Sequence, residues 1–172
     1  MRWLLYLVIA GCWSAPSTTP EAAQPTLTLS EHGAGMITAK STATLVALRE
    51  TLPKLRVVPK NDPNLEFDLY DDNVMIGYVV PNDDGSVFNV QVSSDKVVIE
   101  GKPWRAGQPF QSSKGIDTCE CWGENPTCYR KGEHLAVSFA RSCFDSEDTR
   151  SYKALDGLVV QRVIWSVTPF GS

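Results

Sequence analysis

Residues 65–92 read LEFDLYDDNVMIGYVVPNDDGSVFNVQV, which is the most strand-like stretch of the chain. Apolar and polar side chains alternate through residues 65–70, as they do in a half-buried strand. Turn sequences follow at residues 71–73 and 81–85. The second turn ends in Asp84-Gly85, a strong hairpin signal because such a turn needs a positive φ. The stretch therefore predicts three strands in an antiparallel meander.

A short amphipathic helix is predicted before the meander. Leu45, Leu48 and Leu52 follow one another at the i, i+3 and i+7 spacing of a helix face, and Pro53 ends the pattern. Thr42-Ala43-Thr44 precedes them and supplies a hydroxyl that can accept a hydrogen bond from an N–H group of the first turn. This is the one clear helix that the sequence predicts.

Further strands are expected on both sides of the meander, where short apolar runs lie between turn sequences. They cover residues 26–30, which lead into the turn His32-Gly33-Ala34-Gly35, and residues 56–58, 135–139 and 158–167. The region from Gly101 to Thr118 is predicted to be a loop, and we expect its Trp104 and Phe110 to dock onto the sheet. Residues 144–153 form a charged excursion between the last two strands.

These elements together predict a single α+β domain over residues 26–172, with the helix packed on an antiparallel sheet. The order of the elements also suggests an internal duplication. Phe67–Val92 forms a strand-turn-strand unit, and Leu135–Val167 repeats it with a larger insertion. Gly107-Gln108-Pro109-Phe110 then stands where the first half has its helix.

The composition excludes several classes of protein. The chain has 172 residues, of which 42% are hydrophobic and 21% charged, with a formal net charge of −4. The apolar content is too high for a disordered chain, and the acidic balance argues against a general nucleic-acid binder. The long apolar run near the start is too short to span a bilayer as a helix. One folded domain with a linker fits these numbers.

The N-terminal segment has the layout of a lipoprotein signal. Met1-Arg2 gives a positive start, residues 3–10 are apolar, and Ile9-Ala10-Gly11-Cys12 resembles the lipobox of bacterial lipoproteins. We therefore expect residues 1–11 to be removed and Cys12 to carry the lipid that anchors the chain to a membrane. A simple secretory signal with an unmodified Cys12 stays open. A start codon upstream also stays open, because this segment is shorter than the usual signal of about 15 to 30 residues.

Residues 12–25 predict an extended tether between the lipid anchor and the domain. The segment is rich in Pro, Ser, Thr and Ala and has no hydrophobic periodicity. The residue directly after the lipidated cysteine is Trp13 and not Asp. By resemblance to enterobacterial lipoproteins, this residue makes the outer membrane the expected destination, with the domain facing the periplasm.

Four cysteines remain once Cys12 is lipidated, and they are Cys119, Cys121, Cys128 and Cys143. The cell envelope is an oxidising compartment, so this even set is expected to form two disulfides. Three pairings are possible, and the sequence leaves them open. We favour Cys121 with Cys128, brought together by a turn at residues 123–126, and Cys119 with Cys143.

No catalytic, metal-binding or cofactor-binding motif stands out. Gly33-Ala34-Gly35 lacks the third glycine of a dinucleotide-binding fingerprint, and Asp71-Asp72 and Asp83-Asp84 lie in turns without the ligand ladder of a calcium loop. A zinc site of the four cysteines with His134 is the sharper alternative, but their spacing lacks the Cys-x₂-Cys knuckles of structural zinc sites. We expect no enzyme activity, no cofactor and no metal.

Residues 120–131 are the candidate interaction surface, interpreted as a loop braced by disulfides. Trp122, Tyr129 and Arg130 are the candidate binding residues. A braced loop holds an aromatic side chain ready for a partner and lowers the entropy cost of binding. The alternative is that Trp122 and Tyr129 pack back on the domain.

Several segments occur in an order that resembles a known family. These segments are residues 29–39 (LSEHGAGMITA), Gly107-x-Pro109-Phe110, the pair from Cys119/Cys121 to Cys128 followed by residues 135–139, and residues 159–165. They resemble the RpoE-regulated lipoprotein family of uncharacterised envelope proteins in Gram-negative bacteria. The insertion Cys-x-Cys-Trp-Gly and Cys143 depart from that pattern. The resemblance implies a lipid-anchored protein linked to envelope stress, and it supplies no catalytic residues.

The leading hypothesis is a non-enzymatic envelope lipoprotein that binds an envelope protein or the cell wall, in envelope maintenance or the stress response. The alternative is a hydrolase that acts on the cell wall, or an inhibitor of such an enzyme, with Asp117, Glu120 or Glu124 as its acids. Two carboxyl groups that face each other across a cleft at about 5 to 10 Å would favour the hydrolase.

Overall fold

A computed structural model describes residues 25–60, 65–111, 115–143 and 153–172. The predicted signal peptide, Cys12 and most of the tether lie outside the described residues, as does nearly all of the charged excursion at 144–153. Within the described ranges, no helix combines the length and hydrophobicity needed to cross a bilayer.

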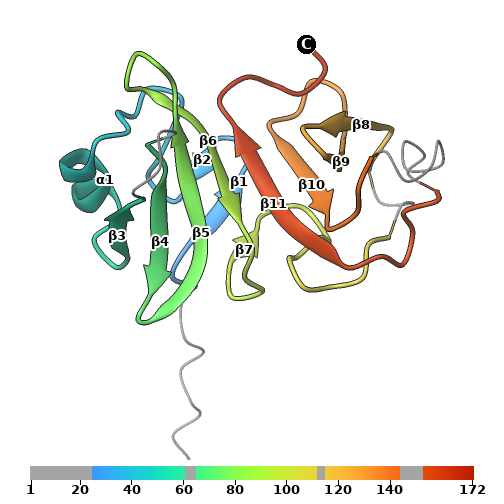
Figure 1. The fold of residues 1–172 in the computed structure, drawn as a ribbon, viewed down its shortest axis with the longest axis horizontal. Helices are drawn as coiled ribbons and strands as arrows, with labels where there is room; N and C mark the ends of the chain where they lie inside the picture. The colour runs from blue at the N-terminus through green and yellow to red at the C-terminus, as the bar shows by residue number, and fades with distance from the viewer. Residues whose placement is uncertain (1–24, 61–64, 112–114, 144–152) are drawn as a thin grey trace, which may run out of the picture.

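An eight-stranded antiparallel sheet forms the centre of the domain (Figure 1). Every pair of neighbouring strands in it is antiparallel. The predicted meander is confirmed, because the strands of residues 65–92 are consecutive neighbours. In spatial order the strands are β3 (Arg56–Pro59), β4 (Phe67–Asp71), β5 (Val74–Pro81), β6 (Val87–Val92), β11 (Val160–Ser166), β10 (Leu135–Phe139), β9 (Asn125–Tyr129) and β8 (Thr118–Trp122).

A second layer packs on one face of this sheet. It contains the helix α1 (Leu45–Thr51) and a small sheet of three strands, β1 (Thr28–Ser30), β2 (Gly33–Ala34) and β7 (Val98–Ile99). The helix begins where the sequence predicts, since the Thr44 hydroxyl accepts a hydrogen bond from the Ala47 N–H. The α+β class is therefore confirmed. One detail was wrong: Gly33 and Ala34 do not belong to the turn predicted at residues 32–35 but form β2, which pairs with β1.

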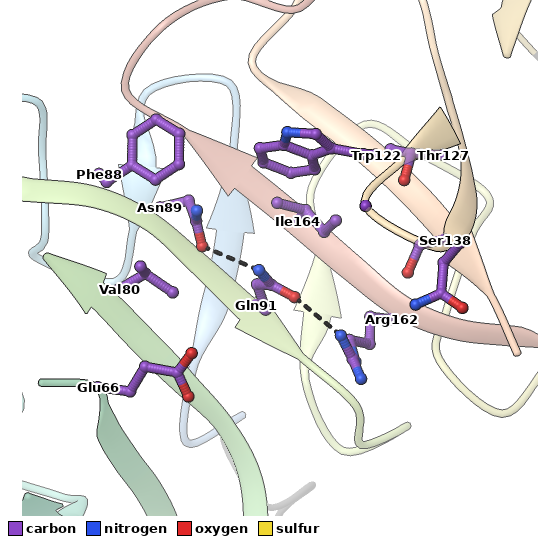
Figure 2. Close-up of a pocket in the computed structure, with 12 residues that line it drawn as sticks. Glu66, Val80, Phe88, Asn89, Gln91, Trp122, Thr127, Ser138, Arg162 and Ile164 are labelled. Carbon is purple, nitrogen blue, oxygen red and sulfur yellow. Dashed lines mark hydrogen bonds between the residues drawn. The ribbon is translucent and has the colours of Figure 1, made fainter. Parts of the chain in front are cut away.

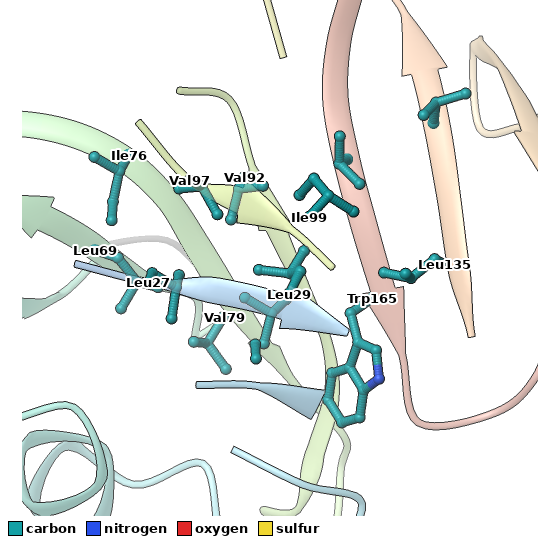
Figure 3. Close-up of a cluster of buried hydrophobic side chains, with 14 of the residues drawn as sticks. Leu27, Leu29, Leu69, Ile76, Val79, Val92, Val97, Ile99, Leu135 and Trp165 are labelled. Carbon is teal, nitrogen blue, oxygen red and sulfur yellow. The ribbon is translucent and has the colours of Figure 1, made fainter. Parts of the chain in front are cut away.

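The core lies between the two layers (Figure 3). Alternate residues of the central strands face it, among them Val90 and Val92 of β6 and Val163 and Trp165 of β11. Leu29 of β1 faces them from the second layer and is fully buried. Trp104 and Phe110 also join this cluster, so the prediction that they dock onto the sheet is confirmed.

The eight-stranded sheet consists of two four-stranded meanders, β3 to β6 and β8 to β11, which meet where β6 pairs with β11. In each half, a residue that precedes the meander donates a backbone hydrogen bond to the loop before the last strand of that meander. In the first half Ala43 N–H donates to the Gly85 carbonyl, and in the second Phe110 N–H donates to the Leu158 carbonyl. The topology therefore has the repeat that an internal duplication predicts, although residues 107–110 form no helix.

A β-bulge occurs at the same position in each half. Phe88 is the extra residue where β6 pairs with β5, and Gln161 is the extra residue where β11 pairs with β10. A bulge bends its strand and increases the local twist. Both central strands therefore bend at corresponding points, close to the junction of the two halves.

The segment predicted as a disulfide-braced loop is a hairpin of two strands, β8 and β9. Its turn has only two residues, Gly123 and Glu124, and Gly123 has a φ of 65°. This register places Cys119 directly opposite Cys128, whereas a four-residue turn would have placed Cys121 there. Two disulfides form, as predicted, but the favoured pairing was wrong: Cys119 bonds Cys128, and Cys121 bonds Cys143.

Candidate functional site

The candidate site lies on the face of the eight-stranded sheet that points away from the core. Because side chains alternate along a strand, the neighbours of the core-facing valines gather on this opposite face. Cross-strand register places Gln91 between Tyr78 of β5 and Ile164 of β11. It also places Ser138 between Arg162 of β11 and Thr127 of β9. These two rows run side by side across the junction of the halves.

A hollow of about 280 Å³ opens on this face above β6 and β11 (Figure 2). Its lining is mostly polar, with carboxamides, hydroxyls and one residue of each charge, and it also contains two aromatic rings. The lining residues are Glu66, Val80, Phe88, Asn89, Gln91, Trp122, Gly123, Asn125, Thr127, Ser138, Arg162 and Ile164.

A directed network of hydrogen bonds orders the floor of the hollow. The Tyr78 hydroxyl donates to Gln91 Oε1 at 2.6 Å, and Arg162 Nη1 donates to the Tyr78 oxygen at 3.0 Å and to Gln91 Oε1 at 3.3 Å. Gln91 Nε2 in turn donates to Asn89 Oδ1 at 3.2 Å, as the dashed lines in Figure 2 show in part. Burial raises the pKa of Tyr78, and the Arg162 charge opposes this shift. The phenol thus stays protonated and keeps its role as donor.

The two charged residues of the lining differ in their partners. Glu66 forms an ion pair with Lys60, whose Nζ lies 2.8 Å from its carboxylate. Arg162 is half-buried, and within the described part of the chain no carboxylate lies within ion-pair distance of it. Glu66 and Asp68 both lie close enough to raise the pKa of Tyr78, so acidic groups are nearby. Arg162 nevertheless has no direct ion-pair partner among the described residues.

Ser138 adds a polar group that is also left unsatisfied. Its side chain is only 3% exposed, and its hydroxyl has no hydrogen-bond partner among the described residues. A buried hydroxyl without a partner costs free energy unless something else supplies one. Ser138 lies beside Arg162 and Thr127 in the lining of the hollow, so a group bound in the hollow can be that partner.

Two aromatic side chains border one end of the hollow. Trp122 lies edge-on to Phe88, with ring centroids 6.1 Å apart, and edge-on to Phe170, at 5.4 Å. Edge-to-face contacts of this kind fix a ring in one orientation. The Cys121–Cys143 disulfide also ties the hairpin that carries Trp122 to the chain beyond β10. Trp122 is therefore held in place beside Ile164 and the polar floor.

The three predicted binding residues have different environments. Trp122 lines the hollow, but Tyr129 is only 2% exposed and stacks on Phe170 at 5.2 Å between ring centroids. Tyr129 thus packs back on the domain, which was the alternative interpretation. Arg130 is exposed and lies 3.8 Å from a Glu133 oxygen, away from the hollow. Their part in binding stays a prediction.

Most of the lining is not predicted from the sequence, above all Arg162, Gln91 and Asn89. The signal was present as polar residues that alternate with Val90, Val92 and Val163. What the sequence did not reveal is that β6 pairs with β11, since these strands are about 70 residues apart in the chain. Without that pairing, Gln91 and Arg162 have no reason to meet.

The acids proposed for a hydrolase lie elsewhere. Asp117, Glu120 and Glu124 do not line the hollow, and its one carboxyl group belongs to Glu66. Asp117 accepts hydrogen bonds from the Thr118 hydroxyl and the Lys131 N–H, which fits a role in the hairpin. The zinc alternative loses its ligands, because all four cysteines form disulfides. Over the described ranges, no group of three or more His, Cys, Asp or Glu residues is placed to hold a metal.

Comparison with known proteins bears on the fold. No family model matches the chain, and no curated protein matches it. The fold is similar to that of the uncharacterized protein yfeY from Escherichia coli. The crystal structure of yfeY has a TM-score of 0.59 and 21% identity to this chain, over 81% of this chain and 99% of yfeY. At this identity the likeness shows a shared fold alone.

Proposed function

We propose that this chain is a lipoprotein of the cell envelope, anchored through Cys12, whose domain binds another envelope component. The observation that carries the proposal is the use of cysteine. The four cysteines of the domain form two disulfides, and only Cys12 of the five is left over. Disulfides persist in oxidising compartments such as the periplasm. A single remaining cysteine after small residues in a signal-like segment is what lipid attachment requires.

Two further observations support this proposal. The segments quoted above resemble the RpoE-regulated lipoprotein family, and the fold is similar to that of yfeY over nearly the whole of that protein. On the outward face of the sheet, the domain offers a hollow lined by an arginine without an ion-pair partner among the described residues and by a fixed aromatic ring. These features are typical of a binding site. Trp13 favours the outer membrane as the location, facing the periplasm.

Intact-mass analysis of the membrane fraction tests the anchor. We expect the mature chain to begin at Cys12 and to carry the added mass of its acyl chains. A Cys12→Ser variant should lose that mass and leave the membrane fraction. Reduction should add four hydrogen atoms, two for each disulfide. A mature chain with an unmodified Cys12 would contradict the proposal, whatever its location.

A further inference from the structure

We propose that the hollow above β6 and β11 binds a saccharide that carries a carboxylate group, with Arg162 as the contact for that carboxylate. The inference deepens the proposed function, because it names the bound envelope component by its chemistry. It rests on the proposed function for the choice of a cell-wall sugar as the probe.

Arg162 supplies the positive charge that would contact the carboxylate. Its Nη1 donates hydrogen bonds to two neutral oxygens, those of Tyr78 and Gln91. The guanidinium has five N–H donors in a planar fork, and the fork matches a carboxylate in a bidentate manner. Tyr78 and Gln91 hold Nη1 and so fix the plane of the fork. Because Arg162 has no ion-pair partner among the described residues, its remaining N–H groups can bind one anionic group of a ligand.

The hydrogen-bonding groups favour a ligand with many oxygens. Gln91 Oε1 is occupied by two donors, and Asn89 Oδ1 accepts from Gln91, so the Asn89 amide nitrogen is directed toward other acceptors. Ser138 contributes a buried hydroxyl without a partner, and Thr127 lies beside it in register. Hydroxyls and carboxamides both donate and accept. A sugar hydroxyl does the same, which makes it the matching group.

The aromatic border favours a ring with an apolar face. Trp122 is fixed by its contacts to Phe88 and Phe170, and Ile164 extends the apolar surface beneath it (Figure 2). A pyranose ring has C–H groups on one face and hydroxyls around its edge. Such a ring can lie against Trp122 while its edge meets Asn89 and Gln91. The volume of about 280 Å³ lies just below the usual range for ligand pockets, about 300 to 1,000 Å³, and suits one sugar ring.

The test compares two sugars that differ mainly in the carboxylate. N-acetylmuramic acid carries a lactyl carboxylate, whereas N-acetylglucosamine has the same ring without it. Isothermal titration of the full chain in detergent should show that N-acetylmuramic acid binds at least tenfold more tightly. NMR of the side-chain amides should show shifts at Asn89 and Gln91 with the acid. Equal affinities would overturn the assignment of a carboxylate ligand, and no binding of either sugar would overturn the whole proposal.

Variants test whether Arg162 is the contact. Arg162→Gln should remove the preference for the acid, and Arg162→Lys should restore part of it, since lysine keeps the charge without the fork. Arg49→Gln is the matched control, because Arg49 lies on the helix and donates to the Val57 carbonyl. Arg49→Gln should bind like the native chain. A preference for the acid that survives in a folded Arg162→Gln chain would contradict the proposal.

Asn125→Asp gives a second test that leaves the network around Arg162 intact. Asn125 lines the hollow at the start of β9, and a negative charge there should repel the acid at least threefold while leaving N-acetylglucosamine unaffected. An unchanged affinity for the acid in this variant would place the carboxylate elsewhere. If alanyl-alanine shifted the same amides while the sugars did not, a peptide ligand would replace the saccharide.

The proposed lipid anchor and the proposed saccharide site can be overturned independently of each other. The Cys12→Ser chain should bind N-acetylmuramic acid as tightly as the lipidated chain, because Cys12 is not part of the lining. An acylated chain that binds neither sugar would overturn this inference and leave the anchor in place. An unmodified chain that binds the acid would overturn the anchor and leave this inference in place.

Discussion

Cys119 and Cys128 lie directly opposite each other on β8 and β9, with their Cα atoms 4.1 Å apart. This separation is that of a close cross-strand pair, and it follows from the two-residue turn at Gly123-Glu124. The turn sets the register, and the register sets the pairing. Cys121 is then left to reach Cys143.

Cleavage after glutamate residues should reveal this pairing. Cuts after Glu120 and Glu124 separate Cys119, Cys121 and Cys128 into three different peptides. Without reduction, mass spectrometry should find residues 121–124 joined to the peptide that holds Cys143. If residues 121–124 were instead joined to residues 125–133, which hold Cys128, the hairpin register would be wrong.

Removal of the Cys121–Cys143 disulfide should lower the free energy of unfolding. The bond closes a loop with a sequence separation of 22, and a cross-link of this size stabilises a domain by about 3 kcal/mol through the unfolded chain. Urea unfolding of a Cys121→Ala, Cys143→Ala chain without reductant measures the loss. The same chain should bind the acidic sugar more weakly, because its hairpin no longer holds Trp122 in place. If the folded variant bound the sugar with native affinity, the disulfide would not be needed to hold Trp122 in place for binding.

Tyr129 should make the domain less stable at alkaline pH. Burial and then a hydrogen bond to Glu120 raise the pKa of Tyr129 from 10.0 to about 12. The folded state therefore holds its proton more tightly than the unfolded state. The stabilisation is complete below pH 10 and is lost between pH 10 and 12, by at most about 1.4 kcal/mol for each pH unit.

Tyr129→Phe should flatten this loss, because phenylalanine has no proton to release. Urea unfolding at several pH values from 9 to about 12 measures the slope. Tyr70→Phe on β4 serves as the control for the removal of a phenol elsewhere in the sheet. An equal slope in the native chain and in Tyr129→Phe would contradict the prediction.

The Thr44 cap should contribute to the stability of the helix. Its hydroxyl accepts from the Ala47 N–H at 3.3 Å, so Thr44→Ala leaves that donor without its protein partner. The expected cost is about 1 kcal/mol in the free energy of unfolding. Thr44→Ser keeps the hydroxyl and should be close to native. If both variants lost the same amount, the methyl group and not the cap would be responsible.

Leu29 should matter far more than an exposed apolar residue on the same part of the chain. Leu29 is 0% exposed and packs in the core between β1 and the sheet, whereas Met36 is 71% exposed. Leu29→Ala removes buried contacts and leaves a cavity, so we expect a loss of about 2 to 5 kcal/mol. Met36→Ala should change stability by less than about 0.5 kcal/mol. Thermal and urea unfolding measure both, and a comparable loss at Met36 would contradict the burial pattern.

The sequence predicts the local elements well where alternation and turn chemistry are strong. The meander of residues 65–92 and the helix after Thr44 are examples, because each depends on neighbours in the chain. The sequence predicts a loop where the β8–β9 hairpin lies, since Thr118–Trp122 has no apolar alternation of the usual kind and β9 contains Pro126, a residue that is rare in strands. Its cysteines alternate with Thr118, Glu120 and Trp122, and this pattern could have revealed the strand.

The site could not be predicted in the same way. Arg162 meets Gln91 only because the last strand pairs with a strand of the first half, and long-range pairing leaves no local signal. The sequence did predict Trp122 as a binding residue, but the prediction was based on the segment 120–131 and not on the polar residues of the hollow that Trp122 borders. Local sequence thus defines the strands, while tertiary pairing creates the hollow.

The position of β11 also has a consequence for how the chain reaches its native state. This strand is the last of the described strands in sequence order but lies in the middle of the sheet, between β6 and β10. Until residues 160–166 are available, β6 and β10 each have an open edge, and such edges can pair with other chains. Folding of the two halves is therefore coupled through the final strand. A chain cut short before Val160 should aggregate instead of folding into a smaller version of the domain.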